Sequence, residues 1–251
     1  YFFGFVGKVE SPLAYRTIGV IGAMEEEVEK FQSFMRHAAV SVKAGIRFCE
    51  GEWEGRRVIV CKSGVGKVNA AVCTQILIDV FGAEAVIFTG VAGALHPELD
   101  IGDIVVSEDC LQHDMDVTAL GFAPGVIPFA AESVFPADRG LADAALEAGN
   151  ALFPGKVRPG RVLSGDQFLA DREKTAALRE RHRGDCVEME GAAVAQVCRL
   201  NGIPFVILRA VSDKADGSAH MDFQEFVRLA SERSAAIVEE MLRVLPSGRN
   251  G

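Results

Sequence analysis

RVIVCKSGVGKVNAAVCTQILIDVFGAEAVIFTGVAG, residues 57–93, is the stretch that decides the fold. Arg57–Cys61 is an apolar run typical of a strand, and Lys67–Phe81 has the apolar spacing of a helix. Ala85–Thr89 is a second short apolar run, typical of a buried strand, and glycine-rich Gly90–Gly93 is expected to end it. A strand, a helix and a buried strand in this order are typical of proteins in which helices cover a largely parallel sheet.

The same alternation of strand and helix patterns continues in both directions from this stretch. The other expected strands are Thr17–Gly22, Asp103–Asp109, Lys156–Leu163, Asp185–Glu188 and Phe205–Val211, and Val40–Glu54 together with Arg57–Cys61 is expected to form two or three antiparallel strands. The other expected helices are Glu25–Met35, Asp138–Leu152, Arg172–Arg181, Glu190–Asn201 and Asp222–Leu245. This order predicts an α/β fold, a three-layer sandwich with a twisted, mostly parallel mixed central sheet flanked by helices.

The length of 251 residues suits one well-packed domain, because neither a repeat nor a linker divides the chain. We expect a single domain over residues 16–251, preceded by an N-terminal extension or processing remnant over residues 1–15. The aromatic start of that segment lacks the pattern of a signal peptide. Gly121–Pro136, rich in Gly and Pro, is expected to be a long loop suited to a lid or a subunit contact.

Composition excludes several kinds of partner. The chain carries 26 basic and 35 acidic residues, a net charge of −9, which disfavours nucleic acid and anionic membranes as partners. Its six cysteines form no CxxC motif, so we expect reduced, buried thiols in a cytoplasmic protein. Its five histidines show no metal-ligand spacing, so we expect no metal site.

The segment Val187–Ala192, VEMEGA, places Glu188 and Glu190 on either side of Met189. Carboxylates are rarely buried without a partner, so this pair suits a ligand with several hydroxyl groups, and the thioether suits its apolar face. Taken alone, the segment is more often a strand end with acids facing solvent that favour the next helix N-terminus.

Four segments at expected strand ends carry further polar or small residues. They are Gly22–Glu27, Thr89–Gly93, Ser164–Leu169 and Leu208–Asp213. Each has a simple structural explanation: a charged helix start, a glycine turn, a core aromatic in Phe168, and separate salt bridges for Arg209 and Asp213. Their coincidence at strand ends, where ligands of α/β sheets bind, favours a site.

Together these segments resemble, over residues 17–245, the 5'-methylthioadenosine/S-adenosylhomocysteine nucleosidases of the nucleoside phosphorylase superfamily. The matching stretches are IGAMEEEV (21–28), KSGVGKVNAA (62–71), TGVAGAL (89–95), GDIVVS (102–107), HDMDVTA (113–119), SGDQF (164–168), VEMEGAA (187–193), LRAVSDKAD (208–216) and HMDF (220–223). The resemblance implies hydrolysis of the N-glycosidic bond of 5'-thio-substituted adenosines by a homodimer that needs no cofactor.

The resemblance also implies roles for individual residues. Glu27 corresponds to the general base that activates water, and Asp213 to the acid that assists protonation of adenine N7. Glu190 and Met189 would bind the ribose, and Arg209 would support Glu27 or the water. Phe168 would stack on the base, the Leu169 backbone would read the adenine edge, and the rest of the pocket would comprise Met24, Val65, Val91, Ala92, Gly93, Ser212 and Phe223. Val117, Leu120 and Pro128 of the partner subunit would surround the 5' substituent.

Two positions depart from the usual pattern, and two other functions compete with hydrolysis. Val91 stands where Ser is frequent, and Ala94 where Gly is frequent. The sequence of residues 112–128 and the SGDQF motif resemble those of members that also cleave 6-amino-6-deoxyfutalosine for menaquinone synthesis. The resemblance also admits 5'-deoxyadenosine as a substrate. The alternatives are a purine nucleoside phosphorylase, whose phosphate Glu27 would repel, and a non-catalytic nucleoside-binding protein, for which Glu27, Arg209 and Asp213 together would serve no purpose.

Overall fold

The computed structural model describes residues 15–22, 25, 28–214 and 223–246. Its strands are β1 Thr17–Gly22, β2 Arg36–Lys43, β3 Ile46–Trp53, β4 Arg56–Lys62, β5 Ala85–Ala94, β6 Ile104–Gln112, β7 Val134–Pro136, β8 Val157–Ser164, β9 Cys186–Glu188 and β10 Phe205–Asp213. Its helices are α1 Glu29–Phe34, α2 Lys67–Asp79, α3 Arg139–Leu152, α4 Arg172–His182, α5 Gly191–Asn201 and α6 Phe223–Val244, with a 3-10 turn at Thr118–Leu120. None of these helices is long and apolar enough to cross a membrane.

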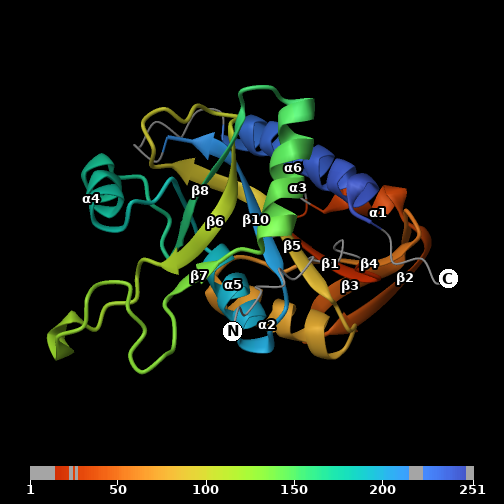
Figure 1. The fold of residues 1–251 in the computed structure, drawn as a ribbon, viewed down its shortest axis with the longest axis horizontal. Coiled ribbons are helices and arrows are strands. Elements are labelled where there is room, and N and C mark those ends of the chain that lie inside the picture. The colour runs from red at the N-terminus through yellow and green to blue at the C-terminus, as the bar shows by residue number, and fades with distance from the viewer. Residues whose placement is uncertain (1–14, 23–24, 26–27, 215–222, 247–251) are drawn as a thin grey trace, which may run out of the picture.

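The strands form one mixed sheet that closes on itself at one side (Figure 1). β1, β4 and β5 run parallel, and β10 continues the parallel set beside β5. β4 also pairs with β3 in the antiparallel sense expected for Arg57–Cys61. Beyond β10 the order continues through β6, β8 and β9, and β9 pairs back onto β5. The site described below is therefore held by strands that are hydrogen-bonded on both sides.

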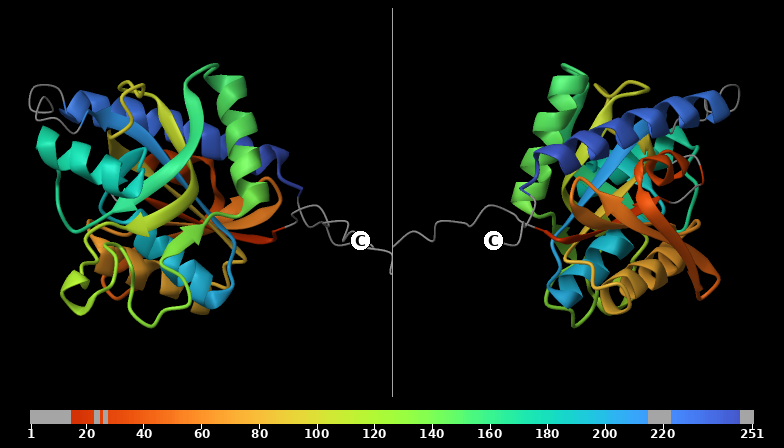
Figure 2. Two further views of the ribbon diagram at one scale, coloured as in Figure 1. Left: turned by 60° about the vertical axis from the view of Figure 1, so that its left-hand side comes forward. Right: turned by 90° about the vertical axis from the view of Figure 1, so that its right-hand side faces the viewer.

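Helices cover both faces of the sheet, which gives the expected three layers. Figures 1 and 2 show α3 and α6 on one side and α2 and α5 on the other. Two hydrophobic cores match these layers: one contains Leu77 of α2 and Val194 of α5, and the other contains Leu141 of α3 and Ile237 of α6. Each of these side chains is fully buried, so each helix is fixed against the sheet by its apolar stripe.

Three of the differences between expected and observed boundaries have a clear physical reason. The first helix ends at Phe34 rather than Met35, because the backbone of Met35 is extended and β2 begins at the next residue. β5 does not end at Thr89: it runs through Gly90–Gly93 to Ala94, because β10 and β9 supply hydrogen-bonding partners there. The expected loop Gly121–Pro136 ends in the short strand β7, paired with β6. A glycine-rich segment can therefore continue a strand where neighbouring strands supply its hydrogen-bonding partners.

Candidate active site

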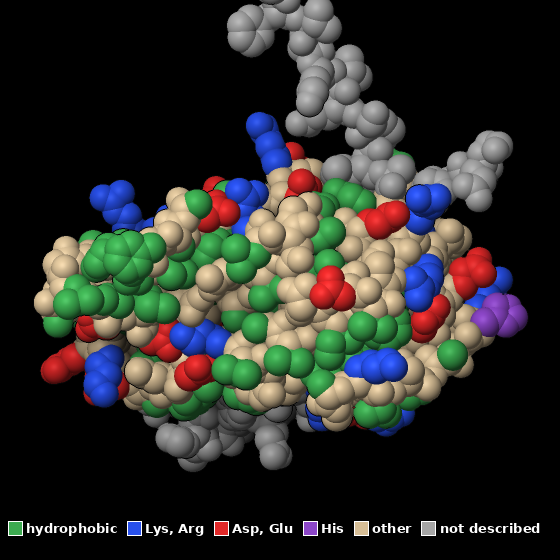
Figure 3. Space-filling view, turned by 90° about the horizontal axis from the view of Figure 1, so that it is seen from below, with side chains coloured by type: hydrophobic (Ala, Val, Ile, Leu, Met, Phe, Trp, Pro, Cys, Tyr) green, Lys and Arg blue, Asp and Glu red, His purple; other side chains and the backbone are tan. Residues whose placement is uncertain are grey.

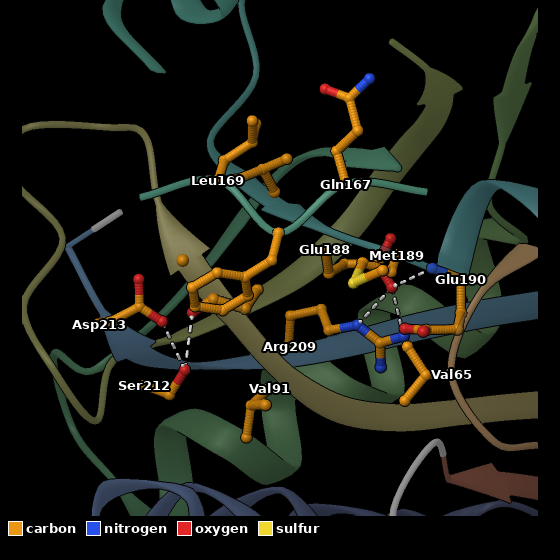
Figure 4. A pocket seen from close by; sticks show the side chains of 14 residues that line it. Val65, Val91, Gln167, Leu169, Glu188, Met189, Glu190, Arg209, Ser212 and Asp213 are labelled. Carbon is orange, nitrogen blue, oxygen red and sulfur yellow. Dashed lines mark hydrogen bonds and ion pairs between the residues drawn. The ribbon is translucent and has the colours of Figure 1, made fainter. Parts of the chain in front are cut away.

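A cavity of about 260 Å³ lies where β5 and β10 end, beside β9 and the turn that follows β8 (Figure 4). Most of the residues that the sequence assigns to the site line this cavity: Val65, Val91, Ala92, Gly93, Phe168, Leu169, Glu188, Met189, Glu190, Arg209, Ser212 and Asp213. They come from five segments distant in the sequence, so only the fold brings them together.

Two of the expected site loops are strands. In the parallel pair of β5 and β10, Arg209 lies beside Gly90 and Asp213 beside Gly93. The register shifts between Val211 and Asp213, so Ser212 lies in a bulge. Side chains normally alternate between the faces of a strand, and a bulge changes that alternation. The bulge explains why the adjacent side chains of Ser212 and Asp213 both line the cavity.

Glu188 and Arg209 form a buried ion pair at the centre of the cavity wall. Arg209 Nη2 and Nε lie 2.6 and 3.0 Å from Glu188 Oε2, and the two side chains are 1% and 3% exposed. The guanidinium also lies over the Phe88 ring, 3.9 Å from its centroid. A buried charge needs a partner of opposite sign, and each of these two residues supplies it for the other. The structural salt bridge that the sequence allowed for Arg209 is therefore present, and its partner is Glu188.

The carboxylate of Glu188 also begins helix α5. It accepts hydrogen bonds from the backbone N–H groups of Glu190, at 3.1 Å, and Gly191, at 2.8 Å. The hydroxyl of Ser164 donates to its other oxygen and accepts from the N–H of Ala192 at 2.7 Å. Of the simple explanation of this segment, the acid at the helix N-terminus is present, but the exposure to solvent is not, because Glu188 and Glu190 are both buried.

Glu190 is held by a glycine of the segment that precedes α2. Its Oε1 accepts a hydrogen bond of 2.7 Å from the N–H of Gly66, the residue before α2. The φ of Gly66 is +97°, and a Cβ there would lie 3.2 Å from Asp166 Oδ1. The close approach of this backbone to Glu190 therefore depends on glycine.

Asp213 lies at the opposite end of the cavity from Glu190 (Figure 4). It is buried, and Ser212 Oγ donates to its Oδ2 at 2.9 Å. Two buried carboxylates thus face one apolar space from its two ends, with Met189 beside Glu190 and the buried ion pair between the two ends.

The thiols nearest the buried ion pair are unsuited to nucleophilic chemistry. Burial first, and the charge of Glu188 second, raise the pKa of both Cys110 and Cys186 well above its usual range. A thiol in such an environment stays protonated and inert at neutral pH. Neither cysteine is among the described residues that line the cavity.

Several expected site residues are not placed at this cavity. Met24 and Glu27 lie outside the described residues, and Phe223 begins α6, its side chain likewise undescribed. Val117 and Leu120 lie at the 3-10 turn after β6 and Pro128 lies further along the same loop, and none of the three lines the cavity of the single chain. Of the two departures, Val91 lines the cavity, and Ala94 is buried where β5 pairs with Cys186 of β9.

Sequence reasoning missed four residues of the site. Gln167 and Val187 line the cavity, and both stand within segments that were already recognised. Ser164 and Gly66 hold the two glutamates, over separations of 24 and 124 residues. The short glycine-rich segment before α2 can be recognised in the sequence, but the sequence does not reveal which carboxylate its N–H groups bind.

Comparison with known proteins agrees with this fold. Residues 17–243 match the family model described as Phosphorylase superfamily. A 5'-methylthioadenosine/S-adenosylhomocysteine nucleosidase of Geobacillus kaustophilus is 42% identical over 92% of this chain and 98% of the relative. The crystal structure of the Neisseria meningitidis enzyme of that name, in complex with methylthio-immucillin-A, covers 92% of this chain and all of its own, with 41% identity and a TM-score of 0.88.

A third similar protein carries a different name. The structure of futalosine hydrolase from Helicobacter pylori is 34% identical, with a TM-score of 0.86, and the match covers 90% of this chain and 97% of that protein. The fold and the cavity thus define a phosphorylase-superfamily protein. Within that superfamily, the chain belongs to the family of 5'-methylthioadenosine/S-adenosylhomocysteine nucleosidases.

Proposed function

We propose that this protein hydrolyses the N-glycosidic bond of 5'-methylthioadenosine and S-adenosylhomocysteine, releasing adenine and 5-methylthioribose or S-ribosylhomocysteine. One observation favours hydrolysis over phosphorolysis: acids outnumber cations among the described residues that line the cavity, and the guanidinium there is bound to a carboxylate. Among the described residues that line it, Glu188, Glu190 and Asp213 carry acid groups and Arg209 alone is cationic, bound to Glu188. A phosphate dianion needs unpaired cations or several N–H donors, so this lining favours water as the nucleophile.

The chemistry divides between the two ends of the cavity. Asp213 assists protonation of adenine at N7 while the bond between the anomeric carbon and N9 breaks. Glu27, which we assign as general base, accepts a proton from the water that forms the new bond to the anomeric carbon. Glu190 accepts hydrogen bonds from ribose hydroxyls, and its negative charge stabilises the positive charge that develops on the sugar. Each proton transfer of this kind contributes about 10²–10⁴-fold to the rate.

The remaining lining residues provide shape. Phe168 is assigned to the face of the base and the Leu169 backbone to its edge, while Met189 contacts the sugar. Phe168 is 60% exposed, unlike a core aromatic, and this exposure at the cavity wall suits contact with a planar base. Arg209 fixes Glu188 and, through it, the start of α5, and we also assign to it the support of Glu27 or the water.

Substitution of Asp213 by Asn tests the acid role. The amide keeps the size of the side chain but cannot protonate the base, so kcat should fall by about 10²–10⁴-fold. Adenine release from 5'-methylthioadenosine measures the rate, and circular dichroism controls for folding. Turnover within a few-fold of the unsubstituted protein would remove Asp213 from the mechanism.

Dependence on phosphate separates hydrolysis from phosphorolysis. We expect the same rate of adenine release in phosphate-free and phosphate-containing buffer, with a free sugar as the second product. A rate that requires phosphate, with a sugar 1-phosphate as product, would identify a phosphorylase. Binding of the nucleoside without any product in either buffer would identify a non-catalytic binding protein.

A second substrate class is supported by the futalosine hydrolase of Helicobacter pylori, whose structure this chain resembles at a TM-score of 0.86. We propose that 6-amino-6-deoxyfutalosine is also cleaved, since the reacting bond is the same and only the 5' arm differs. Specificity constants for 5'-methylthioadenosine, S-adenosylhomocysteine, 5'-deoxyadenosine and 6-amino-6-deoxyfutalosine would rank the substrates. A constant for the futalosine derivative that is indistinguishable from background would remove it.

We further propose that the working unit is a cytoplasmic homodimer, in which Pro128 of the partner subunit lies near the 5' substituent. Figure 3 shows hydrophobic side chains gathered over the face that carries α2, α5 and the loop after β6. Val65, Val68 and Val72 are 52%, 74% and 40% exposed, and Phe129 is 97% exposed. Apolar surface of this kind supports a protein partner. All six cysteines are free and buried, which suits a reducing compartment.

The dimer is tested by placing a charge in this face. Val68→Glu should shift the protein toward monomers in sedimentation velocity, since burying an unpaired carboxylate in an interface is costly. Val42 on strand β2 is also exposed, at 59%, so Val42→Glu is the matched control and should leave the oligomeric state unchanged. Equal behaviour of both variants would place the interface elsewhere or exclude it.

A further inference from the structure

Three charged residues beside the cavity form a closed ring of contacts. Lys67 Nζ lies 2.6 Å from Asp114 Oδ1, and the N–H of Asp166 donates to Asp114 Oδ2 at 2.9 Å. The N–H of Lys67 in turn donates to Asp166 Oδ1 at 2.8 Å. The residues begin α2, follow β6 and follow β8, so the ring joins three segments that are distant in the sequence.

The ion pair of Lys67 and Asp114 is shielded from solvent more than an ordinary surface ion pair, whereas Asp166 is exposed. The side chains of Lys67 and Asp114 are 18% and 14% exposed. Lys67 Nζ also donates to Gln112 Oε1 at 3.0 Å, and Gln112 Nε2 donates to Gln196 of helix α5 at 2.5 Å. Burial raises the pKa of Asp114, but hydrogen bonds from Lys67 and from the Asp166 N–H together lower it below its usual range. The ion pair therefore stays charged at neutral pH, in a setting with little solvent screening.

Lys67 and Asp166 are each adjacent in the sequence to a residue that contacts or lines the cavity. The N–H of Gly66, adjacent to Lys67, donates to the buried Glu190 at 2.7 Å. Consecutive N–H groups of one turn, Gly66 and Lys67, thus bind two different carboxylates, one in the cavity and one in the ring. On the other side, Asp166 directly precedes Gln167 and Phe168, which both line the cavity.

We propose that the ring of Lys67, Asp114 and Asp166 is a positioning device that fixes the sugar-binding acid Glu190 relative to the base-binding turn at Gln167 and Phe168. None of the three residues is among those that line the cavity, so they act through Gly66 and through the turn. This inference rests on the proposed hydrolysis of purine ribosides, because the ring matters only if both ends of the substrate are held at once. A displacement of about 1 Å of such a group can cost about 10²-fold in rate.

Lys67→Met removes the charge and keeps the length of the side chain. We expect kcat/KM for 5'-methylthioadenosine to fall by between about tenfold and 10²-fold, and Lys67→Arg to recover most of it. Lys156→Met is the matched control: Lys156 lies 2.9 Å from Asp103, whose side chain is 12% exposed, and neither residue lines the cavity. That variant should lose no activity.

A double-mutant cycle shows whether the ring acts through Glu190. If it does, the loss caused by Lys67→Met should shrink in the Glu190→Gln background, because the group being positioned is already changed. An equal loss in both backgrounds, or kcat/KM of Lys67→Met within twofold of the unsubstituted protein, would overturn the proposal.

Two further results complete the test. If Lys67→Met does not fold, Asp114→Asn weakens the same ring without changing its shape; if neither variant folds, the ring serves folding rather than positioning and the proposal fails. If the unsubstituted protein releases no adenine, the proposed function fails first, which is distinct from an active protein that is indifferent to Lys67.

Discussion

At the scale of single residues, Glu188 stabilises two parts of the structure at once. Its carboxylate neutralises the buried Arg209 and accepts the first N–H groups of α5. Removing one partner of a buried ion pair leaves an uncompensated charge, whereas a pair at the surface contributes little because water and ions screen it.

Glu188→Gln should therefore lower the free energy of unfolding by about 3–5 kcal/mol. Glu50 gives the control, because its pair with Arg57 has a similar distance of 2.7 Å but side chains that are 38% and 41% exposed. Glu50→Gln should cost no more than about 1 kcal/mol. Urea unfolding measures the loss in free energy of unfolding for both variants. Similar losses would mean that the buried pair is not what stabilises this region.

At the scale of elements, the start of α2 depends on a glycine with two functions. Gly66 has a φ of +97°, which few other residues adopt, and its N–H binds Glu190. Gly82, after the same helix, has a φ of +66° and open space where a Cβ would lie. The two glycines share the backbone requirement and differ in their contact with the cavity.

Gly66→Ala and Gly82→Ala should both destabilise the protein, by about 1–3 kcal/mol where the backbone is strained. Only Gly66→Ala should also raise KM for the nucleoside, because the shifted turn no longer holds Glu190. Thermal unfolding and steady-state kinetics of both variants provide the comparison. A KM that is unchanged in Gly66→Ala would show that this N–H does not position the acid for substrate.

The strands also set the precision of the site. Arg209, Ser212 and Asp213 belong to β10, which is bonded to β5 on one side and to β6 on the other. Groups carried by paired strands hold their positions better than groups on loops. The bulge at Ser212 is the one local departure in this pairing, and it brings two successive side chains to the cavity.

At the scale of the whole molecule, two buried histidines link folding to pH. Burial is the largest cause that lowers the pKa of His113 and of His182, and mutual repulsion adds to it for His182. Neither Nε2 atom has a hydrogen-bond partner in the part of the chain that the structure describes. Both imidazoles are therefore neutral in the folded state, and protonation favours the unfolded chain.

The sign of the effect follows from the direction of these shifts. A histidine whose pKa is lowered by folding does not change the free energy of unfolding above about pH 6.5, its pKa in the unfolded chain. As the pH falls below that value, the same histidine lowers the free energy of unfolding. We expect the urea midpoint to drop between pH 7 and pH 5, before most carboxylates are protonated. His113→Gln with His182→Gln should flatten that slope. An equally steep slope in the double variant would assign the acid sensitivity to other groups.

The alternation of apolar runs and helical spacing in the sequence determined the α/β fold, because burial against a sheet demands such periodicities wherever the chain packs. The ordered motifs pointed to the family and to most of the residues that line the cavity. Only the tertiary structure decided that Gly90–Gly93 is strand and that Glu188 is neutralised by Arg209. Likewise, only the tertiary structure decided that Gly66 holds Glu190 over 124 residues of chain. Periodicity reports which faces of an element are buried, but a hydrogen-bond partner is chosen by the packing of distant segments, which local sequence does not encode.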